Sequence, residues 1–497
     1  MMMNQIPKPF FCASARRQPD KENNLKQSQV PNNSSSFYSQ WRGAHAGWIL
    51  RESAKPSERL LQAVWSHQRL DRNQLRLVDG RTLRVLHPGF LNRESGPDFR
   101  RAIVQFENDL PVTGDIEIDL EPSGWHSHGH ANNPTYAGVI LHIVWRGAPS
   151  NTLPTLTLAG SLDAPIEELA CWLGGDTPPP SANLLGRCNA PLSDLPSERI
   201  EDLLRQAAMI RLSAKAHQFT ACARRAGWEQ SLWEGLFRAL GYKNNIWPMQ
   251  RLAELLPVLR ELPLTLVQWR ARLLGLAGLL PAETLRSPLS SDVALRQLWE
   301  DWWRIRASIC DQILPRTIWR MAGLRPANHP IRRLTLAAHW LAQSEFIARL
   351  DEWLLLAAKD SSPANSLLRL LQSDEDPNDT SQLSKPMQLL GASRATDLAV
   401  NVILPWFWAR AGSGQNKSLQ LQVEELFLAW PAGEDNAVLK LTRQRLFAGP
   451  RRLRSAAEQQ GLLQIARDYC DHSNALCEHC PFPDLVRSWA ATPSGCN

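Results

Sequence analysis

Acidic side chains in two neighbouring segments have the types and spacing of metal ligands. Asp98 stands in SGPDFRRA, and Glu117 and Asp119 stand in GDIEIDLE. Carboxylate oxygens suit Mg²⁺ or Mn²⁺, and such a cation polarises a phosphate and activates a water molecule. Because side chains alternate along a strand, Glu117 and Asp119 share one face and can both reach the same ion. The alternative is a solvated acidic strand face that binds nothing.

Three histidines follow these acids in the segment WHSHGHANNPTY. His126, His128 and His130 are spaced by two, so an extended segment would place the three imidazoles on one face. Three neutral imidazoles form a ligand set for a transition metal, typically zinc. The alternatives are phosphate contact or proton transfer near neutral pH, and a polar loop whose histidines bind the backbone. His142, in an otherwise apolar segment, is expected to be a core histidine with a hydrogen-bond partner.

A third group of possible ligands lies near the C-terminus, in YCDHSNALCEHCPF. Cys470, Cys477 and Cys480 have the spacing C-x6-C-x2-C, which is typical of metal binding in a cytosolic protein. Thiolates bind Zn²⁺ or an iron–sulfur cluster, and both usually take four protein ligands. The candidates for the fourth ligand are His472, His479, Cys496 and Cys188. The alternative is a set of reduced structural cysteines.

Two arginine-rich segments could contact phosphates. They are GLRPANHPIRR, with Arg325, Arg332 and Arg333, and AGPRRLRSAAEQQ, with Arg451, Arg452 and Arg454. Guanidinium groups suit a phosphate backbone, and the net charge of +6 permits nucleic acid as a partner. The alternative is a solvated charged face. The chain lacks a P-loop, a GxSxG motif, a Rossmann fingerprint and an HExxH motif, which disfavours the NTPase, α/β-hydrolase and zincin classes.

The acids are expected on the strands of a mixed sheet. Alternating segments on both sides of Asp79-Gly80 predict a hairpin. Residues 97–121 predict a second strand pair with a turn around Glu107–Pro111, and GVILHIVWRG predicts a buried central strand. TLPTLTLAG predicts a further strand. A helix over Pro56–Leu70, opened by a serine cap, precedes these strands, and another over Pro165–Leu173 follows them.

From about residue 195 the pattern is almost wholly helical. A long helix is expected from Ser197, and further helices are expected over Glu229–Leu240, Met249–Leu256, Leu264–Leu280, Ala294–Cys310 and Ile331–Ala348. The twenty tryptophans are expected mainly in the core. The predicted fold class is therefore α+β, with an N-terminal mixed sheet and flanking helices, followed by a large all-α region that ends in the cysteine cluster.

Length and composition predict several domains in the cytoplasm. A chain of 497 residues is too long for one core. The predicted division is a disordered extension over 1–50, an α+β domain over 51–175, a linker over 176–195, a helical domain over 196–465 and the cysteine cluster over 466–497. No apolar run is long enough to cross a bilayer, and the N-terminal residues lack the apolar stretch of a secretory signal. Nine scattered cysteines indicate a reducing compartment.

The order of these elements resembles a known nuclease core. A helix, a strand, a strand that begins with Pro-Asp and a strand with an acid-x-residue motif are similar to the PD-(D/E)XK superfamily. The resemblance implies that Asp98 and Glu117 bind the metal and that Glu58, on the first helix, is an auxiliary acid. Asp119 stands where that superfamily has a lysine that helps to activate water, so it could only be a ligand or a general base. The helix usually found after the Glu117 strand is not expected.

Two further resemblances are present, and the first covers nearly the whole chain. The segments ERLLQAVW, GPDFRRA, GDIEID, GWHSHGH, YAGVILHIVW, GYKNN and GLRPANHPIRR, with the terminal cysteines, look like one uncharacterised bacterial family of unknown function. The cysteines also resemble those of RecB-like nucleases, in which a terminal cluster and an upstream cysteine hold a [4Fe–4S] cluster. That resemblance implies Cys188 as the fourth ligand, while zinc remains the alternative.

These observations predict a metal-dependent phosphodiesterase that acts on DNA or RNA. Asp98 and Glu117 would bind Mg²⁺ or Mn²⁺, the histidines would contact the substrate, and the helical half would form a positively charged lid or channel. A competing hypothesis is a catalytically inactive nucleic-acid-binding or scaffold protein that retains a nuclease fold. A third is a zinc hydrolase centred on His126, His128 and His130. The expected partner is nucleic acid rather than a membrane, and the oligomeric state stays open.

Overall fold

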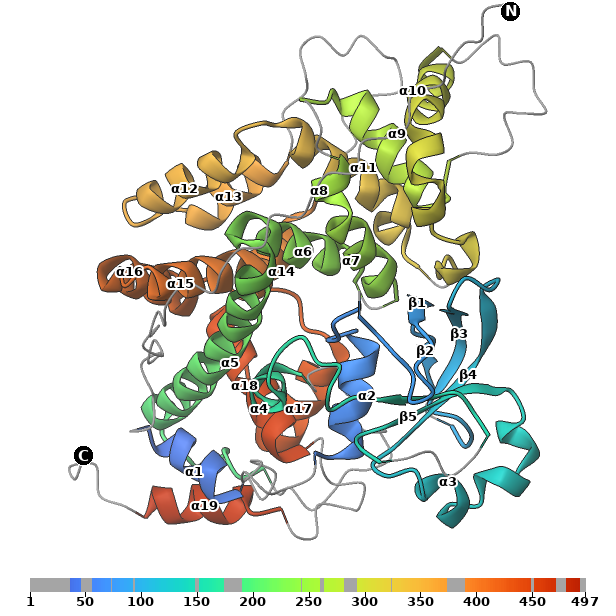
Figure 1. The fold of residues 1–497 in the computed structure, drawn as a ribbon. Coiled ribbons are helices and arrows are strands. Elements are labelled where there is room, and N and C mark those ends of the chain that lie inside the picture. The colour runs from blue at the N-terminus through green and yellow to red at the C-terminus, as the bar shows by residue number, and fades with distance from the viewer. Residues whose placement is uncertain are drawn as a thin grey trace, which may run out of the picture. The chain divides into compact units, whose positions relative to one another are not determined.

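The computed structural model in Figure 1 describes most of the chain between residues 36 and 491. The described ranges are 36–45, 56–72, 74–92, 94–147, 152–173, 190–242, 244–259, 263–280, 293–322, 324–372, 389–447, 451–470 and 480–491. Contacts divide the chain into residues 1–32 and residues 33–497, and every described range belongs to the second unit. Within these ranges, the helices are too short or too polar to cross a membrane.

A six-stranded mixed sheet lies in the N-terminal part of the second unit. Its strands are β1 Leu83–His87, β2 Phe90–Leu91, β3 Phe99–Phe106, β4 Val112–Asp119, β5 Val139–Val144 and β6 Thr155–Thr157. The strand order is β1-β3-β4-β5-β6, and β2 pairs with β3. The pairs β1–β3 and β3–β4 are antiparallel, whereas β4–β5 and β5–β6 are parallel. The predicted strand pair around Glu107–Pro111 and the predicted central strand β5 are confirmed.

Helix α2, Glu58–Ser66, begins where the sequence predicts. Ser57 adopts an extended backbone and its side chain accepts a hydrogen bond from the backbone N–H of Leu60, which satisfies one of the free donors of the first turn. Leu61, Val64 and Trp65 are fully buried in the same hydrophobic cluster as the strands. The apolar face of α2 therefore fixes the helix on the sheet, and its first residue, Glu58, is positioned at the edge of that contact.

A bulge in β3 sets the register between the acid-bearing strands. Phe99 pairs with Ile116 and Ala102 pairs with Gly114, with an irregularity between the two pairs. Arg101, inside the bulge, has a φ of 58°, and its N–H donates to the Asp115 carboxylate over 3.0 Å. Asp115 therefore holds the bulge. Phe99 is the residue opposite Ile116, so Asp98 lies one residue before this pair.

Helices make up the rest of the described chain. They are α1 Phe37–His45, α3 Gly124–Ser127, α4 Ile166–Trp172, α5 Ser197–Ala226, α6 Trp228–Leu240, α7 Ile246–Glu254, α8 Leu256–Leu259, α9 Leu266–Leu276, α10 Val293–Ile309, α11 Pro330–Ala342, α12 Phe346–Ala357, α13 Pro363–Leu371, α14 Ala392–Leu398, α15 Leu404–Ser413, α16 Lys417–Ala429, α17 Ala437–Phe447, α18 Ala456–Ile465 and α19 Phe482–Ala490. Trp340, Trp406 and Trp430 are almost fully buried, which confirms the core position expected for tryptophans. The predicted fold class, a mixed sheet followed by a large helical region, is confirmed.

Helix α1 forms inside the N-terminal segment for which the sequence predicts no order. The Tyr38 side chain is fully buried, and its O–H donates to the Asp468 carboxylate over 2.8 Å. The Phe37 ring stacks on Trp489 with 4.5 Å between centroids. This corrects the prediction for residues 36–45, because the aromatic residues of FYSQW bury an apolar face that the polar residues around them conceal.

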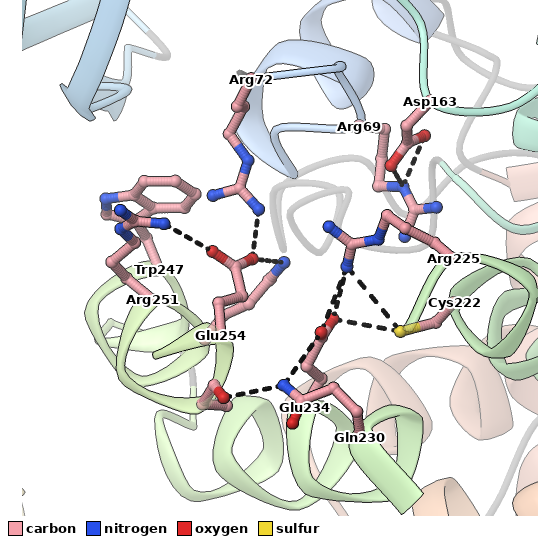
Figure 2. A network of polar contacts seen from close by, with 12 residues as sticks. Arg69, Arg72, Asp163, Cys222, Arg225, Gln230, Glu234, Trp247, Arg251 and Glu254 are labelled. Carbon is pink, nitrogen blue, oxygen red and sulfur yellow. Dashed lines mark hydrogen bonds and ion pairs between the residues drawn. The ribbon is translucent and has the colours of Figure 1, made fainter. Parts of the chain in front are cut away.

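Buried ion pairs join the sheet-bearing part to the helical part, as Figure 2 shows. The Arg72 guanidinium, just after α2, pairs with Glu254 on α7 and lies 5.2 Å from the Trp247 ring centroid. Arg251 pairs with the same carboxylate at 3.2 Å. The Trp247 indole N–H donates to the backbone oxygen of Leu86 on β1. These contacts hold α7 against the end of β1.

Candidate metal centre

Asp98 and Glu117 meet at the junction of β3 and β4. The backbone N–H of Asp98 donates to Oε2 of Glu117 over 3.1 Å, and the N–H of Ile118 donates to Oδ2 of Asp98 over 3.1 Å. The Glu117 residue is only 6% exposed. The antiparallel pairing of Phe99 with Ile116 produces this meeting, because it sets the preceding residue of one strand beside the following residue of the other. The two predicted ligands are therefore brought together.

Helix α2 adds a third carboxylate and an amide to this pair. The Gln62 side-chain amide donates to Oδ1 of Asp98 over 2.8 Å and to Oε1 of Glu58 over 3.4 Å. Burial, and then the charge of Asp119, raise the pKa of Glu58 above its usual value. The predicted auxiliary acid thus belongs to the cluster. Gln62 was missed by sequence reasoning, although its spacing of four from Glu58 on a helix could have indicated a shared face.

Mutual repulsion and burial dominate the electrostatics of the cluster. Burial, and then the charge of Glu58, raise the pKa of Asp98 to about 7. Burial, and then the charge of Asp98, raise the pKa of Glu117 to about 9. Two carboxylates that resist ionisation together gain most from a nearby positive charge. The cluster therefore has the electrostatic character of a site for a hard divalent cation.

Asp119 is fixed by a histidine from the neighbouring strand. The Asp119 residue is 2% exposed, and its Oδ2 lies 2.9 Å from Nε2 of His142, which is fully buried on β5. His142 is confirmed as a core histidine with a partner, but sequence reasoning had not connected it to the acids. On the other side, a Cβ built on Gly124 would lie 2.4 Å from Oδ1 of Asp119. Only glycine lets helix α3 approach the carboxylate this closely.

The three predicted histidines lie on helical turns and not on an extended segment. Helix α3 ends at Ser127, and Gly129 has a φ of 75° before a short 3₁₀ turn begins at His130. The three imidazoles therefore do not share the face that an extended segment would give them, and the expectation of no helix after the Glu117 strand is wrong. His126 is exposed on α3. His128 and His130 turn back toward β4.

His128 and His130 join Asp119 in a compact group of possible ligand atoms. Nδ1 of His128 lies 3.1 Å from Oδ1 of Asp119, and Nε2 of His130 lies 3.1 Å from Oε1 of Glu117. Asp119, His128 and His130 each offer one ligand atom, and these atoms lie within 4.8 Å of one another. Among the described residues, this is where carboxylate and imidazole ligands converge.

Two aromatic residues hold the buried imidazole of His130 in place. The Tyr136 ring stacks on it with 4.0 Å between centroids, and the Trp125 ring meets it edge-on at 5.6 Å. Trp125 also contacts His142, at 5.5 Å. Burial, and then the charge of Glu117, raise the pKa of Tyr136. Both aromatic residues were missed, although they stand within or next to the histidine segment.

Comparison with known sequences places this site in a family. Residues 58–436 match the family described as "Protein of unknown function (DUF2851)". The chain belongs to that family. The comparisons with curated proteins and with solved structures gave no match. The matched residues of this DUF2851 chain include all the acids and histidines of the candidate metal centre, so the centre lies within the family's own sequence.

The predicted cysteine cluster lies beyond the DUF2851 match and only partly within the described ranges. Cys188 and Cys477 lie outside the described residues, as do the alternative ligands His472, His479 and Cys496. Cys470 and Cys480 are described and form no disulfide. The Cys480 thiol lies 3.9 Å from the backbone oxygen of Tyr469. The metal or cluster site at these cysteines stays a prediction.

One arginine of the first predicted patch is not available for nucleic acid. Arg333 is only 3% exposed, and its guanidinium donates to the Leu389 backbone oxygen over 3.1 Å and to the Asn328 side chain over 2.8 Å. Burial lowers its pKa to about 10. The prediction for Arg333 is therefore wrong, because the side chain supports the start of α11. Arg325 is exposed and Arg332 is half-buried.

The second predicted arginine patch lines a cavity of about 840 Å³. Arg451, Arg452 and Arg454 contribute to its wall together with Ser197 and Glu201 from the N-terminal part of α5. Arg452 and Arg454 are exposed, and the Arg451 guanidinium lies 5.6 Å from the Phe447 ring centroid. This segment also follows the DUF2851 match. The structure thus gathers three of the predicted phosphate contacts around one cavity.

Proposed function

We propose that this protein is a metal-dependent phosphodiesterase that acts on nucleic acid. The observation that carries the proposal is the hydrogen-bonded meeting of Asp98 and Glu117, with Glu58 and Asp119 beside them. These neighbouring carboxylates influence one another's pKa and offer the oxygen ligands that Mg²⁺ or Mn²⁺ prefer. When bound there, such a cation would polarise a phosphate and lower the pKa of a water molecule.

The surrounding residues have roles that follow from their contacts. Gln62 and the N–H of Ile118 each take one oxygen of Asp98, so the carboxylate is held in a single orientation. The His128 side chain is 55% exposed, next to Asp119. It is therefore the histidine best placed to contact a substrate phosphate or to exchange a proton with solvent. His130, which is buried, is limited to a role inside the site.

Several observations support a polyanionic substrate in a reducing compartment. The chain carries a net charge of +6, and three arginines line one cavity. Arginine recognises phosphate through paired donors. The cysteines whose side chains are described, Cys222, Cys310, Cys470 and Cys480, form no disulfide, which is typical of the cytoplasm. We therefore propose that the protein acts in the cytoplasm and that its substrate is DNA or RNA.

Cleavage assays on the full chain test the proposal. Single- and double-stranded DNA and RNA are incubated with the protein in Mg²⁺ or Mn²⁺, and in EDTA. Asp98→Asn and Glu117→Gln keep the size of each side chain and remove its charge, so we expect cleavage to fall at least 100-fold. Cleavage that survives both substitutions removes the proposed centre.

A second candidate function is nucleic-acid binding without cleavage. Asp119 stands at the position where the resembling nucleases have lysine, and it is buried against His142. A buried carboxylate supplies no positive charge for water activation. Binding of nucleic acid without cleavage in either metal, with the wild-type chain folded, favours this candidate over the first.

The cysteine cluster is proposed as a separate site for [4Fe–4S] or Zn²⁺. Its support is the C-x6-C-x2-C spacing, with Cys188 as the proposed fourth ligand. Elemental analysis and the visible absorption of protein purified without oxygen distinguish iron–sulfur from zinc. A protein with neither iron nor zinc, whose Cys188→Ser variant is as stable as the wild type, removes this site.

A further inference from the structure

We infer a second cation site at Asp119, His128 and His130, with nitrogen ligands that select a transition metal such as Zn²⁺. It lies beside the all-oxygen site of Asp98 and Glu117 and differs from it in ligand chemistry. The inference does not rest on the proposed function, because a metal can bind there whether or not nucleic acid is cleaved.

The ligand atoms already face one another. Oδ1 of Asp119 lies 3.1 Å from Nδ1 of His128, and one atom of each of the three residues lies within 4.8 Å of the others. Ligand atoms about 2 Å from a zinc ion in a tetrahedral arrangement lie about 3.3 Å from one another, a spacing that the Asp119–His128 pair already approaches. A cation can therefore enter this group with small side-chain movements.

The buried Nε2 of His130 is a second observation that supports a metal site. Nε2 of His130 is buried and makes no hydrogen bond within the described part of the chain, although Oε1 of Glu117 is 3.1 Å away. Buried polar atoms almost always have a partner, and an unpaired one costs about 1–3 kcal/mol. A metal ion would satisfy this nitrogen and keep the neighbouring carboxylate in place.

Residues around the ligands fix them as the supports of a metal site do. His142 binds Oδ2 of Asp119, which leaves Oδ1 for the ion. Tyr136 and Trp125 hold the ring plane of His130. Such outer contacts orient metal ligands and typically change metal affinity by about 10–100-fold when lost. The group is therefore a supported site and not a chance gathering of side chains.

Glu117 connects the two sites through its two carboxylate oxygens. Oε2 accepts the N–H of Asp98, while Oε1 faces Nε2 of His130. Oε2 of Glu117 thus faces the proposed site at Asp98, and Oε1 faces the proposed site at Asp119, His128 and His130. Imidazole favours Zn²⁺ and related ions, whereas an all-carboxylate set favours Mg²⁺ or Mn²⁺. Two different cations can therefore be bound next to each other.

Cobalt titration of the full chain tests the inference. Co²⁺ replaces Zn²⁺ and has a visible spectrum, so bound equivalents can be counted. Because the terminal cysteines can also bind Co²⁺, every variant carries Cys470→Ser, Cys477→Ser and Cys480→Ser. We expect the parent, which carries only the three cysteine substitutions, to bind one equivalent of Co²⁺ with a visible spectrum. His130→Gln and Asp119→Asn should each weaken this Co²⁺ binding at least 10-fold. His217→Gln, on α5, is the matched control and keeps it.

The outcomes separate this site from its alternatives. Thermal melting in EDTA must show that each variant is folded. If the parent shows no visible Co²⁺ spectrum, or if His130→Gln and Asp119→Asn bind Co²⁺ as tightly as the parent, the inference is overturned. Equal loss in His126→Gln overturns the proposed ligand set in favour of the three histidines. Asp98→Asn should keep the Co²⁺ spectrum, because Asp98 belongs to the oxygen site. The cleavage assay tests the nuclease proposal separately, so either proposal can fail without the other.

Discussion

Gly124 decides how closely helix α3 can approach the Asp119 carboxylate. Any side chain on residue 124 would meet Asp119, since a Cβ would lie 2.4 Å from Oδ1 and 2.5 Å from the carboxyl carbon. Asp119 cannot move away without cost, because its other oxygen is bound to the buried His142. Because residue 124 has no side chain, Oδ1 of Asp119 can stay in the position where it faces His128.

Gly124→Ala should weaken the transition-metal site more than it destabilises the fold. The methyl group pushes Oδ1 of Asp119 away, so we expect Co²⁺ to bind about 10–100-fold more weakly, as when an outer contact is lost. Gly160→Ala is the matched control, because a Cβ at residue 160 meets no atom within 4 Å. Equal Co²⁺ affinity in both variants would show that Asp119 tolerates the displacement.

At the residue scale, the sequence predicts ligands better than it predicts their partners. Asp98 and Glu117 were predicted because acids on neighbouring strands are visible in the order of residue types, whereas Glu58 was implied by the nuclease resemblance. Gln62 and His142 were missed because their roles depend on contacts between elements: Gln62 donates from helix α2 to Asp98, and His142 pairs with Glu117 in the β4–β5 ladder. Alternation and spacing within one segment carry no information about these pairings.

At the element scale, Glu254 joins the segment after α2 to helix α7. Its side chain is 7% exposed and pairs with both Arg72 and Arg251, as Figure 2 shows. Arg72 also packs over the Trp247 ring. A buried carboxylate with two guanidinium partners leaves unpaired positive charge when it is removed, so this contact is sensitive to substitution.

Glu254→Gln should therefore destabilise the protein by about 3–5 kcal/mol, the usual cost of breaking a buried ion pair from one side. The exposed pair of Arg487 and Asp484 provides the control, since Asp484→Asn removes a surface ion pair worth about 0–1 kcal/mol. Chemical denaturation of both variants measures the difference. A Glu254→Gln variant as stable as Asp484→Asn would contradict a role for this pair in holding α7.

The same carboxylate predicts a loss of stability in acid. Despite burial, the charge of Arg72 holds the pKa of Glu254 at about 2, below its usual value of 4.5. A carboxyl whose pKa is lowered by folding stabilises the protein above its unfolded pKa and loses that contribution as the pH falls toward its folded pKa. Between pH 5 and pH 2, roughly, the wild type should lose more stability than Glu254→Gln. Parallel losses would show that Glu254 makes no such contribution.

The arginine cavity predicts the salt dependence of nucleic-acid binding. Each phosphate contact that is lost lowers the slope of log affinity against log salt by about one. Arg451→Ala together with Arg452→Ala should therefore reduce the slope by about 1–2 and weaken binding to all sequences alike. Arg487→Ala, an exposed arginine on α19, is the control. An unchanged slope in the double variant excludes the cavity as a phosphate contact.

At the scale of the whole molecule, helix α1 joins residues that are far apart in the chain. Tyr38 donates to Asp468, and Arg42 pairs with the same carboxylate at 3.0 Å. The Trp41 ring meets Phe482 and Trp489 edge-on. Helix α1 therefore packs against α19 and the π-helical turn Ala466–Cys470 that follows α18, so the first and last described helices of the second unit are in contact.

The strands and most helices were predicted because each has its own apolar periodicity. Helix α5, for instance, was expected from Ser197 and begins there. Helix α1 was not expected, because nine residues with three aromatic side chains stand inside a polar stretch. Its order comes from burial against α19, which lies more than four hundred residues later. Contacts of that range leave no periodic signal in either segment, so only the folded chain reveals them.

Tyr38 offers the clearest measurement of this long-range contact. Tyr38→Ala removes a fully buried aromatic ring and should cost about 3–5 kcal/mol, as for other buried aromatic truncations. Tyr38→Phe keeps the ring but removes the donor to a buried carboxylate, so a smaller loss of about 1–3 kcal/mol is expected. Tyr242→Phe, whose residue is 50% exposed, should change stability by less than about 0.5 kcal/mol.

A double-mutant cycle between Tyr38→Phe and Asp468→Asn then separates the hydrogen bond from the packing. If the bond stabilises the protein, the two losses measured by chemical denaturation should be less than additive, because either substitution alone already removes the same interaction. Arg42 and Gln464 also contact Asp468, so Asp468→Asn should cost more than Tyr38→Phe. Strict additivity would mean that the hydrogen bond does not stabilise the protein, whereas a Tyr38→Ala variant as stable as the wild type would mean that the packing of α1 does not stabilise it either.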